Sequence, residues 1–173
     1  MQVSPHFTLA ELTRSQTALR RGIANQPNPS HLLALYALAK HVLEPIRAYF
    51  GPFSPTSCYR SAVLNRAIGG ARHSQHMLGE AADIKLPSVS NRELAYWVAA
   101  HLDFDQLILE FYRPDDPYHG WVHVSFRQEH CRGEILSGRL IDGEITYAAL
   151  PRPPDDPVIG RQTGLYKGYD RCN

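Results

Sequence analysis

Apolar residues recur at helical spacing between residues 30 and 43 and predict one long helix. The apolar stripe of this helix consists of Leu32, Leu35, Leu38 (or Ala39) and Val42. Ser30 is placed to cap its N-terminus. Pro45 lacks a backbone N–H, so we expect the helix to kink or restart near Glu44 and to end at Gly51. The stripe is typical of a helix that packs on a hydrophobic core.

Further helices are indicated by capping residues in front of helical patterns. Thr8 and Glu11 have the spacing of a capping box, which predicts a short helix that frays near Ser15. Ser90 is placed to cap a helix over residues 91–102. Another helix is expected at residues 61–68, before the pair Gly69-Gly70.

Short apolar segments between these helices predict strands at residues 56–60, 81–86, 104–111 and 121–126. Asp142-Gly143 is a strong turn signal and predicts a hairpin that pairs residues 139–141 with residues 144–147. This mixture favours an α+β fold in which helices pack on one face of a small, mainly antiparallel sheet.

The predicted strands gather polar residues on one face. Because alternate residues of a strand share a face, Asp83, His123 and Glu110 can lie on one sheet surface, opposite the apolar positions. Gly79 would let the chain turn so that His76 reaches the same place. These residues offer one carboxylate and two imidazoles, without an obvious fourth protein ligand. Three protein ligands are typical of a catalytic zinc site.

Composition narrows the protein class. The chain has 173 residues, of which 43% are hydrophobic and 20% charged, as expected of one globular domain. We place this domain at residues 1–150 and a Pro- and Gly-rich C-terminal arm at residues 151–173. A net charge of +1 offers no basic surface for nucleic acid. The three cysteines are too few for a disulfide framework, which indicates reduced thiols.

No apolar run approaches the roughly 20 residues that cross a membrane, so no membrane span is expected. The first seven residues lack the basic and apolar regions of a signal peptide. We therefore expect synthesis in the cytoplasm.

Several motifs together resemble the zinc D-alanyl-D-alanine carboxypeptidase family, which includes vancomycin-resistance dipeptidases and phage endolysins. The motifs are Ser74-x-His76-x-x-Gly79-x-Ala81-x-Asp83, Trp121-Val-His123-Val-Ser125, Ser57-Cys58-Tyr59-Arg60-Ser61 with Asn65, and Phe104-Asp105-Gln106-Leu107-Ile108-x-Glu110. The resemblance covers roughly residues 5–135. It implies a zinc-dependent D,D-peptidase that hydrolyses D-Ala-type amide bonds in peptidoglycan peptides.

The resemblance also implies residue roles. His76, Asp83 and His123 would bind one Zn²⁺ ion, and Arg60 would bind the carboxylate or the polarised carbonyl of the substrate. Substrate-binding residues expected beside Arg60 are Ser74, Gln106 and Trp121.

The general base is left open by the resemblance. Many members have a carboxylate three residues before the last histidine, or a second histidine two residues before it, where this chain has Gly120 and Trp121. Glu110 is the expected base and His119 the alternative. Cys58 also stands where the family usually has glycine.

Two functional classes are thus in competition. The first is a metallopeptidase, for which carboxypeptidase and endopeptidase activity are both open. The second is a catalytically inactive, zinc-stabilised module for cell-wall binding or phage tail-tip attachment. The two differ in whether an uncoordinated carboxylate and Arg60 face the metal.

We expect a phage or prophage product that reaches the cell wall after lysis or as part of a particle, with other phage or lysis proteins as partners.

Overall fold

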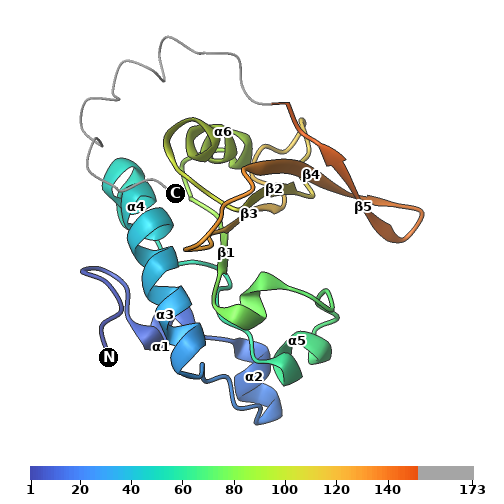
Figure 1. Cartoon of the computed structure of the whole chain (residues 1–173). Helices are drawn as coiled ribbons and strands as arrows, with labels where there is room; N and C mark the ends of the chain where they lie inside the picture. Colours follow the sequence, from blue (N-terminus) through green and yellow to red (C-terminus); the bar gives the residue numbers. More distant parts are fainter. Residues whose placement is uncertain (152–173) are drawn as a thin grey trace.

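A five-stranded sheet lies beside a layer of helices in the computed structural model, which describes residues 1–151 (Figure 1). The strands, in the order of the chain, are β1 (Ala81–Ile84), β2 (Gln106–Glu110), β3 (Trp121–Ser125), β4 (Glu134–Ile141) and β5 (Glu144–Ala149). Their order in the sheet is β1-β3-β2-β4-β5, and every neighbouring pair is antiparallel except β2 and β4. The predicted α+β class with a mainly antiparallel sheet is confirmed.

The helical segments are α1 (Leu9–Leu12), α2 (Gln16–Arg21), α3 (Pro29–Leu38), η1 (Ala39–Leu43), α4 (Glu44–Phe50), α5 (Ala62–Ala67), η2 (Gln75–Leu78) and α6 (Asn91–His101). Thr8 and Ser90 cap α1 and α6 as predicted. The restart of the long helix at Glu44 is also confirmed, because a π-helical turn, η1, precedes Pro45. None of the helices in the described residues is both long enough and apolar enough to cross a membrane.

Two helix predictions near the N-terminus are wrong in detail. Asn28, not Ser30, caps α3: its side-chain oxygen accepts the His31 N–H at 2.9 Å and the Ser30 hydroxyl at 2.7 Å. Ser15 does not mark a fraying end. It caps α2, which the sequence analysis did not predict, by accepting the Ala18 N–H.

The predicted strand at residues 56–60 is wrong. Only Ser57 forms a bridge, with Asp83 of β1. The next N–H groups go to other elements, since Tyr59 donates to the Leu12 carbonyl and Arg60 donates to the His76 carbonyl. This segment is therefore extended, but it bonds to β1, α1 and η2. The last of these bonds holds Arg60 beside η2.

The hydrophobic core lies between the helices and one face of the sheet. The helix segment from α3 to α4 contributes Leu35, Leu38, Val42, Leu43 and Ile46. The sheet contributes Ala82, Ile84, Leu107, Leu109, Val122 and Val124. These strand residues alternate with Asp83, Glu110 and His123, so the opposite face of the sheet carries the polar groups.

The hairpin of β4 and β5 turns at Asp142-Gly143 as predicted, but β4 is longer than expected. It begins at Glu134 because its first half pairs in parallel with β2. The hairpin extends away from the helices in Figure 1. Cys58 is a buried thiol without a disulfide bond, as expected. The predicted arm, except Pro151, lies outside the described residues.

Candidate metal centre

Two of the predicted ligands are fixed by the pairing of β1 with β3. Asp83 and His123 are directly opposite each other in this antiparallel pair, and His123 is also opposite Ile108 of β2. Residues that pair in this way point to the same face of a sheet. The carboxylate and the imidazole therefore meet because of strand register alone.

The third predicted ligand, His76, comes from the short helix η2. Gly79 ends this helix with φ +76°, a left-handed conformation that favours glycine. A β-carbon at Gly79 would also collide with the carbonyl oxygen of His31 in α3 and lie 3.1 Å from Leu35 Cγ. The glycine thus lets η2 pack against α3 and turn directly into β1, which brings His76 to Asp83.

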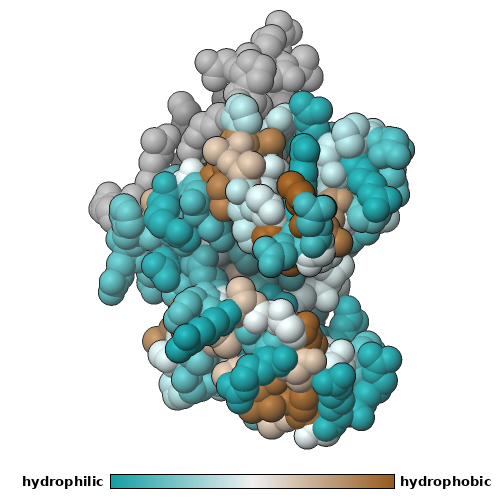
Figure 2. Space-filling view, turned by 90° about the vertical axis from the view of Figure 1, so that its right-hand side faces the viewer, coloured by the Kyte–Doolittle hydropathy of each residue, from teal (hydrophilic) through white to brown (hydrophobic). Residues whose placement is uncertain are grey.

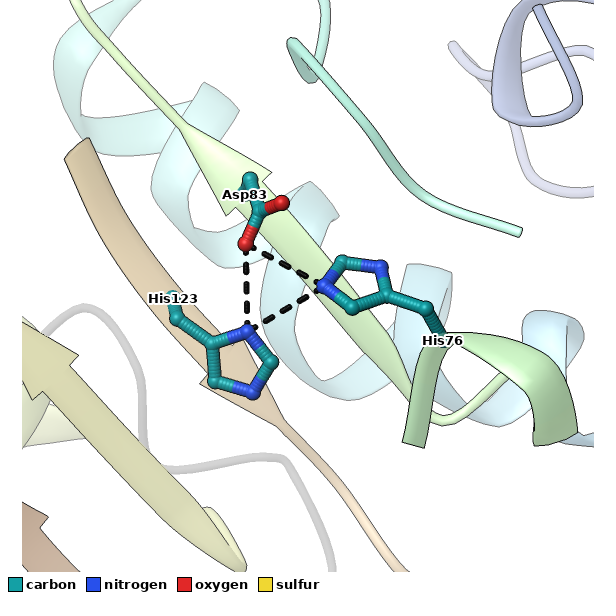
Figure 3. A group of neighbouring side chains, drawn as sticks. All are labelled: His76, Asp83 and His123. Carbon is teal, nitrogen blue, oxygen red and sulfur yellow. Dashed lines mark hydrogen bonds and ion pairs between the residues drawn. The ribbon is translucent and has the colours of Figure 1, made fainter. Parts of the chain in front are cut away.

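The three side chains converge tightly (Figure 3). His76 Nε2 lies 3.2 Å from Asp83 Oδ1 and 3.2 Å from His123 Nδ1. His123 Nδ1 lies 3.1 Å from the same oxygen of Asp83. One ligand atom from each residue lies within 4.8 Å of the others, so the group is able to hold one metal ion. All three residues are buried, with exposed fractions of 1%, 8% and 9% for His76, Asp83 and His123.

The protonation of His76 makes this group suited to a cation. Its Nδ1 donates a hydrogen bond to the Cys58 carbonyl at 2.6 Å, which leaves Nε2 as an acceptor in the neutral ring. Nε2 then faces Asp83 Oδ1, which is also an acceptor. Acceptors that point at one another need a cation between them, and a divalent ion with nitrogen and oxygen ligands meets that need.

The electrostatics agree with a neutral histidine beside an ionised carboxylate. Burial lowers the pKa of His76, and the attraction of Asp83 only partly opposes this. Burial alone would raise the pKa of Asp83, but its close contacts with the two imidazoles outweigh burial, so the pKa is lowered and the carboxylate is ionised. Metal ligands must be deprotonated in this way.

The three residues lie in the wall of a pocket of about 900 Å³. Figure 2 shows this side of the molecule, where the surface is indented between an upper and a lower half. Most of the other predicted site residues line the same pocket, namely Arg60, Ser74, Gln106, Glu110 and Trp121. The structure therefore brings together residues from η2, three strands and the segment before α5.

Glu110 has the surroundings of a base. It is 7% exposed, and its Oε2 is buried without a hydrogen-bond partner among the described residues. Burial raises its pKa above 4.5, although the charge of His123 opposes the shift. A carboxylate with a raised pKa holds and releases a proton nearer to neutral pH.

Arg60 is a second group with unused bonding capacity. Its Nε is buried and has no hydrogen-bond partner within residues 1–151. Burial lowers the pKa of its guanidinium, while Asp83 opposes the shift. A buried donor without a partner is costly in the folded protein, so it is suited to an anionic group that enters the pocket.

His119 is not brought to this pocket. Its Nδ1 donates to the Phe111 carbonyl at 2.6 Å, its backbone N–H donates to the Asp116 carbonyl, and it is not among the residues that line the pocket. Its role as the alternative base stays a prediction that the geometry does not favour.

The β4–β5 hairpin also contributes to the pocket, which was not predicted from the sequence. Leu136, Ile145 and Tyr147 line the pocket, and the Tyr147 hydroxyl lies 3.4 Å from Glu110 Oε1. The turn signal had located the hairpin. Alternation would have placed Ile145 and Tyr147 on one face, but the parallel pairing of β4 with β2 has no local signal.

A buried polar network that supports η2 was also missed. Asp105 is fully buried and accepts hydrogen bonds from Arg132 Nη2 at 2.7 Å and from Gln75 Nε2 at 3.0 Å. Gln75 precedes His76 in the chain. The network therefore attaches the helix that carries His76 to the start of β2, the central strand.

Comparison with known proteins agrees with this site. The family model described as Peptidase M15 matches residues 5–125, which include every residue of the three-ligand group. No curated protein matches the chain. The matched region is well over half of the chain, and the buried group of two histidines and one aspartate suits a metallopeptidase. The chain belongs to the Peptidase M15 family of zinc peptidases.

Proposed function

We propose that this protein is a zinc-dependent D,D-peptidase that hydrolyses D-Ala-type amide bonds in peptidoglycan peptides. One observation carries the proposal: a buried group of three metal-ligand side chains shares its pocket with a buried carboxylate and an arginine. His76, Asp83 and His123 would hold one zinc ion. A zinc ion in that position makes a coordinated water more acidic and polarises a carbonyl group.

Glu110 is proposed as the general base. It takes a proton from the attacking water, and after the attack it gives this proton to the amine that leaves as the C–N bond breaks. Its raised pKa supports this double role, because the protonated form is then easier to reach. Glu110 Oε2 has no hydrogen-bond partner in the described part of the chain, so it is the oxygen available to accept the proton.

Arg60 is proposed to bind negative charge on the substrate. The charge is either the terminal carboxylate of the peptide or the carbonyl oxygen that becomes anionic during the attack. Its Nε, which has no hydrogen-bond partner among the described residues, supports this role, because Arg60 lines the pocket. Ser74, Gln106 and Trp121 line the same pocket and are proposed to contact the peptide.

The competing proposal, an inactive zinc-stabilised binding module, predicts no usable base beside the metal ligands. The presence of Glu110 and Arg60 in the ligand pocket supports the enzyme. We propose that the enzyme reaches the cell wall after lysis or as part of a phage particle.

Digestion of purified peptidoglycan, with and without a chelator, tests the proposed function. Mass spectrometry of the soluble products identifies the bond that is cut and separates carboxypeptidase from endopeptidase activity. We expect peptide products that disappear with the chelator and return when zinc is added. Binding of the intact polymer without any product would support the binding module instead.

A further inference from the structure

Three residues form one row across the sheet beside the metal ligands. Glu110 of β2 pairs with Gly138 of β4, and Gly138 pairs with Tyr147 of β5. Paired residues point to the same face, so the side chains of Glu110 and Tyr147 lie on either side of a glycine. β4 and β5 follow residue 125, where the family match ends, and the match therefore assigns no role to this hairpin.

Gly138 makes the approach of the two side chains possible. A β-carbon at this position would collide with Glu110 Oε2 and would lie 3.0 Å from Tyr147 Cε1. With no side chain between them, the Tyr147 hydroxyl donates to Glu110 Oε1 at 3.4 Å. The phenol ring of Tyr147 also forms part of the pocket wall.

The hydrogen bond leaves one carboxylate oxygen unused. No described residue bonds Glu110 Oε2, which is buried, whereas Oε1 has the hydroxyl of Tyr147. A glutamate side chain has three rotatable bonds, and anchoring one oxygen restricts the orientations that the other can adopt. Restriction of this kind speeds a reaction when the retained orientation is the reactive one.

We propose that Tyr147 is a positioning residue, whose hydroxyl orients the Glu110 carboxylate for proton transfer from the attacking water. This inference rests on the proposed function, because it assigns Glu110 the role of base. It gives the β4–β5 hairpin a role in catalysis, because this hairpin carries Tyr147.

Tyr147→Phe is the direct test, because it removes the hydroxyl and keeps the ring in the pocket wall. On a peptidoglycan peptide, we expect kcat to fall about tenfold, equivalent to about 1.4 kcal/mol, with KM changed less than twofold. Zinc content and melting temperature should equal those of the wild type. Tyr118→Phe is the matched control: Tyr118 is 47% exposed, against 48% for Tyr147, but does not line the pocket. It should leave both constants unchanged.

A double-mutant cycle separates positioning from an independent effect. In the Glu110→Gln background, Tyr147→Phe should cause no further loss of kcat, because its partner carboxylate is already absent. An equal loss in both backgrounds would overturn the proposal, as would a wild-type kcat in the single variant. A rise in KM alone would also overturn it, since it would show that the hydroxyl contacts the substrate.

Crystal structures of the wild type and of Tyr147→Phe provide a readout that needs no substrate. We expect the Glu110 carboxylate to change its orientation or to become disordered in the variant. An unchanged carboxylate would overturn the inference even in an active enzyme. In contrast, a wild type that cuts no peptide but shows the reoriented carboxylate in the variant would refute the proposed function, and with it the catalytic purpose of the contact.

Discussion

Asp83 and His123 face each other across adjacent antiparallel strands, with Asp83 Oδ1 and His123 Nδ1 3.1 Å apart. Two of the three candidate ligands are therefore set by the register of β1 with β3. The third, His76, lies on a short 3₁₀-helix that the fold must hold in place from outside the sheet. The integrity of the site consequently depends on the supports of that helix.

Gly79→Ala should destabilise the protein by more than the strain of an alanine in the left-handed conformation alone. The positive φ accounts for about 1 kcal/mol, and the collision with the His31 carbonyl in α3 adds to it, for a total of about 2–4 kcal/mol. Urea unfolding measures the change. Gly22→Ala is the matched control, since Gly22 has φ +62° but nothing within 4 Å of a β-carbon. Equal losses in the two variants would show that the contact with α3 is not important.

Removal of one imidazole should abolish metal binding. We expect His76→Ala and His123→Ala each to lose the bound zinc that the wild type carries, because two ligands do not retain a catalytic zinc at a dilute concentration. Elemental analysis of the dialysed, folded protein is the measurement. His130→Ala, at an exposed position outside the pocket, should keep its zinc. Full zinc content in His76→Ala would remove His76 from the ligand set.

The Glu110→Gln variant should still bind the metal ion but should lose most of its activity. A general base contributes about 10²–10⁴-fold, so kcat should fall by that factor while zinc content stays at the wild-type value. Because burial raises the pKa of Glu110 above 4.5, activity of the wild type should fall as the pH is lowered through that raised pKa, and the variant should lack this acid limb. Near wild-type turnover in the variant would require another base, and His119→Ala would then be tested.

Asp105→Asn should weaken the fold in a manner that depends on pH. Burial would raise the pKa of Asp105, but its hydrogen bonds from Arg132 outweigh this and lower it below 3.8. The unfolded chain therefore takes up a proton first, and the stabilisation present above about pH 4 is lost as the pH falls through the lowered pKa. The variant should lose about 2 kcal/mol at pH 7 and progressively less towards pH 2.5.

Urea unfolding across that pH range measures the difference for Asp105→Asn. Asp115→Asn, at an exposed loop position, serves as the control and should change stability by no more than about 0.5 kcal/mol at any pH. A loss of the same size at pH 7 and at pH 2.5 would contradict the assignment, because the charge of Asp105 would then make no contribution.

Much of the site could be predicted because strand alternation is a local property. Asp83 and His123 could be assigned to one face from their own strands, and antiparallel register then brought them together. Gly79 could be recognised as the turn that returns His76 to the sheet. Nothing in the sequence, however, measures the space between elements, so the packing of Gly79 on α3 was visible only in three dimensions.

Two of the failures have a common physical cause. The segment at residues 56–60 has the residues of a strand, but its N–H groups go to Leu12 and His76, which are distant in sequence. The place of Tyr147 beside Glu110 depends on the parallel pairing of β4 with β2, which no short motif encodes. Features that depend on pairing between distant segments of the chain could therefore not be predicted from the sequence.

Anomalous diffraction at the zinc edge, from crystals of the zinc-loaded protein, tests the central claim most directly. The account predicts one peak, about 2.0–2.2 Å from His76 Nε2, His123 Nδ1 and the Asp83 carboxylate, with solvent as the remaining ligand. A peak elsewhere in the molecule, or a metal ion closed off by a fourth protein ligand, would contradict it.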